Sequence, residues 1–254
     1  MRQKIKFNIS ASSYSTFKKS PLVFYFNKII NAKPDTKING VYGDAGTIVH
    51  NLLEEYHNDG DIDLLELFNN KWFEEDLSVR PGFNKKTLNS KQYFDCILKG
   101  KELINNNYNI INVEEEIVLP FYDDEILEVN LKGFIDFVAK DGDDIIIGDW
   151  KTNSRVGDFS IHAKMYFLLY YKKHGILPVR AVYEYLKIGE VKVYKFSIEE
   201  VMSFERELIK FVLFIRKAGY NIEKYESGDF SGPFNPFLKK CLNRDSFVNT
   251  IYKE

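Results

Sequence analysis

The sequence has few cysteines, little net charge and no long apolar run, and each shortage excludes a class of protein. Its two cysteines, Cys96 and Cys241, lie far apart, which excludes a disulfide framework and a site built from several cysteine thiolates. The formal net charge of −2 argues against a large basic surface that wraps DNA, although a local basic groove is compatible with it. We see no signal peptide and no membrane-spanning run. We therefore expect the chain to act in the cytoplasm of its host cell and not at a membrane.

Apolar and aromatic residues, by contrast, are abundant. Hydrophobic residues make up 44% and charged residues 28% of the 254 positions, which is typical of a globular protein with a sizeable core. The 21 phenylalanines and 16 tyrosines most simply supply that core, although some could stack on nucleobases. We expect a single domain over residues 1–254, largely helical over 1–108 and carrying its sheet over 109–197.

The most informative segment is a predicted β-hairpin over residues 129–152, V-N-L-K-G-F-I-D-F-V-A-K-D-G-D-D-I-I-I-G-D-W-K-T. Apolar residues on both sides of the Asp141-Gly142 pair favour two strands joined by a tight turn. The return strand ends with Asp149, shortly after three consecutive isoleucines. Because burying an unpaired carboxylate costs several kcal/mol or forces it neutral, Asp149 needs a partner.

The register of this hairpin brings three ionisable side chains together. If Asp141 and Gly142 form the loop, then Asp136, Asp149 and Lys151 point to the same face, because side chains alternate with a period of two. Two carboxylates can hold a hard divalent cation that polarises a phosphate and activates a bound water, and a lysine can position the nucleophile. The alternatives are a surface salt-bridge cluster, or a three-residue loop that turns Asp136 to the other face.

Three other segments carry candidate polar residues. His50 lies off the apolar stripe of a predicted helix over residues 44–58, so it is either a functional residue or simply solvated. His162 and Tyr166 are four apart on a predicted helix that follows the hairpin, and they share one face of it. The alternative there is an ordinary polar helix face beside a core.

The segment before the hairpin, I-I-N-V-E-E-E-I-V-L-P, predicts a strand that begins near residue 110. Glu114 and Glu116 share one of its faces by alternation. Either could contact the ligands of a metal ion without binding the ion itself, but exposure to solvent is the simpler expectation.

The motifs G-F-I-D and I-I-I-G-D-W-K-T together resemble the core of the PD-(D/E)XK nuclease superfamily. They are most similar to its RecB-like branch, whose usual form is G-x-h-D followed by D-x-K-T. Upstream, Gly46 and His50 match the branch's G-x-x-x-H motif. On the later helix, Tyr166 matches the tyrosine of Q-x-x-x-Y, whereas His162 replaces the glutamine.

The resemblance implies an α/β, restriction-endonuclease-like αβββαβ core, with a mixed central sheet flanked by helices and an added N-terminal helical region. It also implies Mg²⁺ or Mn²⁺ as cofactor. The implied metal ligands are His50, Asp136, Asp149 and the main-chain carbonyl of Trp150. The implied catalytic residues are Lys151, Asp136 and Asp149, and the implied DNA-binding residues are His162 and Tyr166.

Some members of this branch also hold an iron–sulfur cluster on one N-terminal and three C-terminal cysteines. Ser20 stands at the first of these positions and Arg244 at one of the others, so we expect no such cluster here. By analogy the chain is a DNA exonuclease that acts on single strands or DNA ends in recombination, repair or replication. The alternative is a catalytically weak nucleic-acid-binding or assembly subunit, with protein partners in a larger DNA-processing complex.

Overall fold

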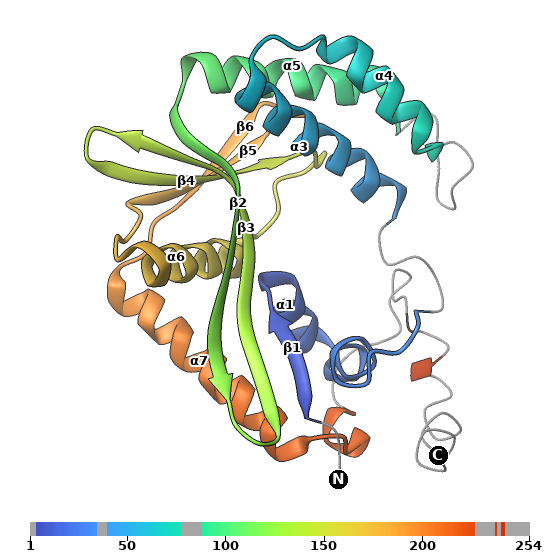
Figure 1. The fold of residues 1–254 in the computed structure, drawn as a ribbon, viewed down its shortest axis with the longest axis vertical. Helices are drawn as coiled ribbons and strands as arrows, with labels where there is room; N and C mark the ends of the chain where they lie inside the picture. Colours follow the sequence, from blue (N-terminus) through green and yellow to red (C-terminus); the bar gives the residue numbers. More distant parts are fainter. Residues whose placement is uncertain (1–3, 35–39, 78–87, 227–236, 238–239, 242–254) are drawn as a thin grey trace. The chain divides into compact units, whose positions relative to one another are not determined.

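The structure, a computed structural model, describes residues 4–34, 40–77, 88–226, 237 and 240–241 (Figure 1). It has a mixed α/β fold in which six strands form one mixed sheet flanked by helices, as predicted. The strand order is β1-β3-β4-β5-β6, and β2 pairs with β3. Among the described residues, no helix combines the length and the apolarity needed to cross a membrane.

The chain divides into two compact units, each assembled from separate segments. One unit comprises residues 39–116 and 134–198, and the other comprises residues 1–38, 117–133 and 199–254. Strands β2 (Asn109–Asp123) and β3 (Leu127–Asp141) contribute residues to both units.

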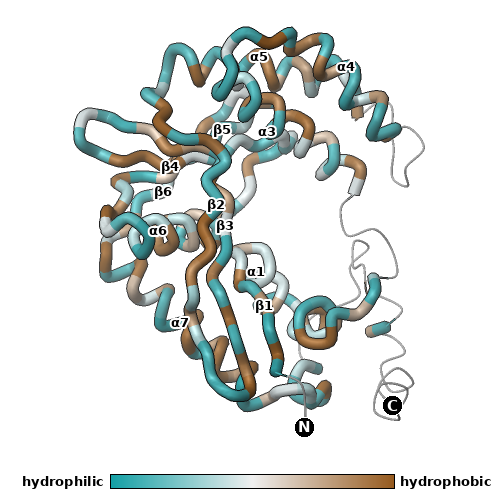
Figure 2. The backbone as a smooth tube through the Cα atoms, viewed as in Figure 1, coloured by the Kyte–Doolittle hydropathy of each residue, from teal (hydrophilic) through white to brown (hydrophobic). Residues whose placement is uncertain are grey.

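The unit of residues 39–116 and 134–198 carries helices on both faces of its strands. Its further elements are α3 (Val41–Asp59), α4 (Leu64–Glu74), α5 (Ser90–Asn106), β4 (Asp144–Lys151), α6 (Ser160–His174), β5 (Arg180–Tyr185) and β6 (Glu190–Tyr194). Helices α3, α4 and α5 share one hydrophobic core with residues such as Ile146 and Val182 on one face of the sheet. Figure 2 shows hydrophobic and hydrophilic residues mixed along these helices, as expected for helices that bury one side only.

The other unit holds the remaining elements. They are β1 (Ile5–Ile9), α1 (Ala11–Lys19), α2 (Pro21–Phe24), the π-helix η1 (Tyr25–Ile29), α7 (Ile198–Ala218) and the 3₁₀ helix η3 (Ile222–Tyr225). Strand β1 was not predicted; it pairs in parallel with β3, from Ile5 opposite Leu127 to Ile9 opposite Leu131. The core of this unit is aromatic: the Phe211 ring of α7 lies 5.3 Å from Phe24 and 4.5 Å from Phe17.

The predicted hairpin is present, but its predicted loop was wrong by one residue. Asp141 pairs with Asp144, so Gly142 and Asp143 form the turn, and Gly142 takes the left-handed φ of 64° that such turns require. The pairing of β3 with β4 is therefore shifted by two residues from the predicted pairing. Since side chains alternate with a period of two, a two-residue displacement keeps Asp136 on the face of Asp149.

Gly148 in β4 allows the Phe137 side chain to pack directly over the β4 backbone. It pairs with Phe137 of β3, and a Cβ atom placed on Gly148 would lie 1.9 Å from the Phe137 ring. That ring packs 5.1 Å from the Trp150 ring, and both side chains are fully buried. The hairpin that carries the candidate residues is thus packed against the α3–α5 core through Phe137 and Trp150.

Candidate active site

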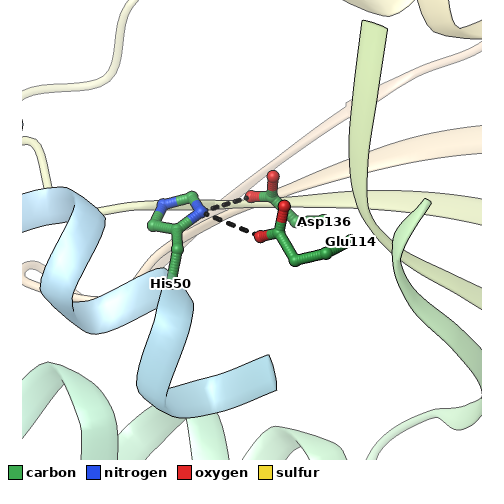
Figure 3. Close-up of side chains that lie close together, drawn as sticks. All are labelled: His50, Glu114 and Asp136. Carbon is green, nitrogen blue, oxygen red and sulfur yellow. Dashed lines mark ion pairs between the residues drawn. The ribbon is translucent and has the colours of Figure 1, made fainter. Parts of the chain in front are cut away.

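Three side chains from three elements converge within one unit of the chain (Figure 3). They are His50 of α3, Glu114 of β2 and Asp136 of β3, and their candidate ligand atoms all lie within 4.8 Å of one another. His50 Nδ1 is 3.2 Å from Asp136 Oδ2 and 3.7 Å from Glu114 Oε1. An imidazole nitrogen with two carboxylates is a donor set that divalent cations accept.

Helix α3 presents His50 because its apolar stripe faces the core. Val49 and Leu53 of that stripe are fully buried, whereas His50 is only partly buried. One turn earlier, Gly46 brings the helix close to the end of β4. A Cβ atom on Gly46 would lie 3.1 Å from Oγ1 of Thr152, so the glycine of G-x-x-x-H sits beside the threonine of D-W-K-T.

Glu114 reaches this cluster because the backbone of β2 departs from regular strand geometry. Its φ of 47° is unusual for a residue other than glycine. Val113 packs in the α3–α5 core, while Glu115 pairs with Lys173 and His174 of α6. Glu114, between these two, points toward His50. Non-glycine residues in this conformation concentrate at functional sites.

The expectation that Glu114 is exposed to solvent was wrong. Its side chain is only 20% exposed, and its Oε1 atom is buried without a hydrogen-bond partner among the described residues. Glu116 is exposed, as expected. Strict alternation concealed Glu114, because it assumes regular strand dihedrals at every residue; the run of three glutamates was the only available signal.

Asp136, Asp149 and Lys151 form the second part of the site. Asp136 accepts a 2.7 Å hydrogen bond from the main-chain N–H of Trp150. Asp149 is 1% exposed, and its Oδ1 lies 2.5 Å from Lys151 Nζ in an ion pair. The Tyr166 hydroxyl lies 3.5 Å from the other carboxylate oxygen of Asp149.

The electrostatics of the site reflect its excess of buried carboxylates. Burial, followed by the charge of Asp136, raises the pKa of Asp149 to about 6. Burial opposes the charged form of His50, but the neighbouring Asp136 outweighs it and raises the pKa of His50 to about 10. Without a cation, therefore, His50 holds a proton between itself and Asp136 at neutral pH. A divalent cation would replace that proton and give Glu114 Oε1 a partner.

Helix α6 presents His162 and Tyr166 beside this pair of carboxylates. The two rings are 6.4 Å apart, and that of His162 also meets Phe159 at 5.5 Å. Burial, followed by the charge of Lys151, lowers the pKa of His162, which keeps it neutral near physiological pH.

The structure places all seven sequence-predicted residues in the same compact unit: His50, Asp136, Asp149, Trp150, Lys151, His162 and Tyr166. Two of them, His50 and Asp136, lie in the three-residue cluster, and Glu114 is its third member. Asp149 lies close enough to Asp136 for the two charges to interact. The Trp150 side chain is fully buried in the α3–α5 core. The catalytic, ligand and DNA-binding roles of the seven stay predictions.

The arrangement defines a class of protein: an α/β fold with carboxylates, a histidine and a lysine gathered at the end of a β-hairpin. The sequence model of the PD-(D/E)XK nuclease superfamily matches residues 8–231, and the chain belongs to this superfamily. Its nucleases bind DNA and use divalent metal ions, for which the cluster around His50 is a candidate site. A comparison with curated proteins finds no match to this chain.

Proposed function

We propose that this chain is a Mg²⁺- or Mn²⁺-dependent deoxyribonuclease of the RecB-like branch. The observation that carries the proposal is the convergence of His50, Glu114 and Asp136 beside the Asp149–Lys151 pair. Carboxylate oxygens suit Mg²⁺, and the added imidazole nitrogen suits Mn²⁺ as well. The G-F-I-D and D-W-K-T motifs and the upstream histidine support the choice of branch.

In this proposal each residue has one task. The proposed ligands of the cation are Asp136, Asp149, His50 and the Trp150 carbonyl, and Glu114 adds a third carboxylate. When bound, the cation polarises the scissile phosphate and makes a bound water more acidic. Lys151 orients that water and stabilises the negative charge that develops on the phosphate oxygens. Tyr166 and His162 donate hydrogen bonds that place the phosphate.

The proposed substrate is single-stranded DNA or a DNA end, and the proposed activity is exonucleolytic. Both rest on similarity to the RecB-like branch, as does a role in recombination, repair or replication. We place the reaction in the cytoplasm of a bacterial or phage-infected cell, where such DNA is processed. Protein partners in a DNA-processing complex belong to the same proposal.

Replacing Asp149 tests the site directly. Asp149→Ala is expected to abolish cleavage of DNA while leaving the circular dichroism spectrum unchanged. Asp144→Ala is the matched control, because Asp144 is an exposed carboxylate at the start of the same strand. Full activity of Asp149→Ala would contradict the proposed site.

The second candidate function is DNA binding or complex assembly without efficient cleavage. It is favoured by one observation, the histidine at position 162 where the branch has glutamine. Calorimetric titration with Mn²⁺ and with a short single-stranded DNA separates the two candidates. Binding of both without any cleavage would favour the scaffold, and metal-dependent cleavage would exclude it.

A further inference from the structure

The ammonium group of Lys151 is enclosed by aromatic rings as well as by a carboxylate. Its side chain is 16% exposed, and its Nζ atom contacts Asp149 on one side. Nζ also lies 4.7 Å from the ring centroid of Phe159 and 5.5 Å from that of Tyr183. These distances allow a cation–π interaction with both rings. Neither aromatic residue belongs to the motifs that relate the chain to its superfamily.

Phe159 and Tyr183 form one platform. Their rings stack in near-parallel planes, with centroids 5.5 Å apart and an interplanar angle of 16°. Tyr183 lies in β5 directly beside Asp149 in the parallel register, and it is fully buried. Its hydroxyl has no hydrogen-bond partner among the described residues, and its contact with Lys151 is made by the ring.

Side chains of β5 and β6 fix the segment that carries Phe159. The Tyr185 hydroxyl accepts a 2.9 Å hydrogen bond from the N–H of Gly157 and lies 3.2 Å from its carbonyl. The Tyr194 hydroxyl accepts a 2.8 Å hydrogen bond from the N–H of Phe159. Lys192 Nζ donates to the Gly157 carbonyl at 3.1 Å.

Gly157 itself is required by this arrangement, since a Cβ atom there would lie 2.9 Å from the Phe159 ring. The chain just before α6 is therefore held at both Gly157 and Phe159. Lysine is a long, flexible side chain whose ammonium group must be held in one place to act on a reacting atom. The fixed platform supplies that restraint together with Asp149.

We propose that Phe159 and Tyr183 are positioning residues that hold the Lys151 ammonium group against Asp149 in the geometry required for cleavage. The inference rests on the proposed nuclease function, because it assigns the two rings a role in that reaction. It predicts that the π faces matter more than the polarity or the volume of the side chains.

Kinetics on variants of Phe159 test the role in the reaction. Phe159→Leu keeps an apolar side chain but removes the π face, and it is expected to lower kcat about tenfold with little change in KM. Phe159→Tyr and Tyr183→Phe keep both rings and are expected to retain most of kcat. An unchanged kcat in Phe159→Leu would overturn the proposal. So would a rise in KM alone, which indicates contact with DNA, or an equal loss in Tyr183→Phe, which indicates a role of the hydroxyl.

Amine labelling of the metal-free protein supplies a readout that does not need activity. Acetic anhydride and mass spectrometry give the labelling rate of Lys151, with Lys187 as an internal reference because it lies 4.6 Å from a separate ring, Tyr93. Phe159→Leu is expected to speed labelling of Lys151 several-fold, and Phe159→Tyr to leave it unchanged. Equal labelling rates in the wild type and Phe159→Leu would overturn the proposal that the two rings hold Lys151.

The two readouts separate the two proposals. If the wild type cleaves no DNA with any cation, the proposed function fails, and the labelling rates still decide whether the rings hold Lys151. If the wild type cleaves and Phe159→Leu matches it in both readouts, only the platform fails.

Discussion

His50 and Asp136 share a proton that a metal ion would have to displace. Asp136 holds the pKa of His50 near 10, so the imidazole is protonated at neutral pH in the metal-free protein. A protonated imidazole cannot ligate a cation. Burial, followed by the charge of Asp136, holds the pKa of Asp149 near 6, so this carboxylate also takes up a proton in mild acid. Measuring proton release on metal binding therefore tests directly whether His50 and Asp149 bind the metal ion.

We expect Mn²⁺ binding to release about one proton per site between about pH 7 and 9, and a second one below pH 6 as Asp149 becomes protonated. Because the metal competes with these protons, the affinity rises with pH through both ranges. Calorimetry in two buffers with different ionisation enthalpies measures the release. His50→Gln should remove the proton released at neutral pH. Binding to the wild type without proton release would contradict the assignment of His50 as a ligand.

Glu114 is the ligand candidate that lies outside the known motif. Glu114→Gln is expected to weaken Mn²⁺ binding by about tenfold or more, since it removes one of three converging carboxylates. Glu116→Gln, at an exposed position of the same strand, is the matched control and should bind like the wild type. The measurement is a calorimetric titration of each variant. Equal affinities for the two variants would remove Glu114 from the site.

Strand β2 is tied to α6 by the residue next to Glu114. Glu115 is 8% exposed and lies 2.7 Å from both Lys173 Nζ and His174 Nε2. Burial opposes ionisation of Glu115, but the hydrogen bonds from these two residues outweigh it and lower its pKa. This contact ties the strand to α6 at the residue next to Glu114, and it helps to define where Glu114 points.

Glu115→Gln should lower the free energy of unfolding by about 1–2 kcal/mol at pH 7, a value reduced because Lys173 and His174 are partly exposed. A group with a lowered folded-state pKa stabilises above its ordinary value of 4.5 and loses that effect as the pH falls. The difference from the wild type should therefore shrink below about pH 4. Urea denaturation at several pH values measures it. A difference that stays constant with pH would show that the ion pair is not its source.

The hairpin of β3 and β4 depends on the contact between Gly148 and Phe137. Gly148→Ala places a methyl group into the Phe137 ring and should cost about 1–3 kcal/mol of stability through overpacking. Gly40→Ala is the control, because a Cβ atom there meets nothing within 4 Å. Chemical denaturation compares the two. A Gly148→Ala protein as stable as Gly40→Ala would contradict the close packing of this hairpin.

Across the chain, the sequence predicted what depends on local pattern and motif. The hairpin and the shared face of Asp136 and Asp149 follow from alternation and from turn residues, whereas the fold class follows from the resemblance of the motifs to the superfamily. The turn itself was displaced, because Asp141-Gly142 and Gly142-Asp143 offer similar turn chemistry and only the full ladder selects between them. Alternation also failed at Glu114, where a left-handed backbone breaks the period.

The local sequence pattern does not predict pairing between strands that lie far apart in the chain. Strand β1 is five residues long and gains its partner, β3, from a segment about 120 residues later. No local signal reports such a parallel partner. Likewise, the stacking of Phe159 on Tyr183 depends on pairings across the sheet, as do the hydrogen bonds of Tyr185 and Tyr194 with the segment before α6. Each of these tyrosines alone reads as an ordinary strand residue.

Digestion of end-labelled single-stranded and double-stranded DNA, linear and circular, tests the proposed nuclease activity of this chain. It is run with Mn²⁺, Mg²⁺ or EDTA on the wild type and on Lys151→Ala. We predict metal-dependent loss of the linear strands by the wild type, none with EDTA and none with Lys151→Ala, while circles stay intact. Cleavage of circles would make the enzyme an endonuclease, and no cleavage with either metal would contradict the proposed nuclease function.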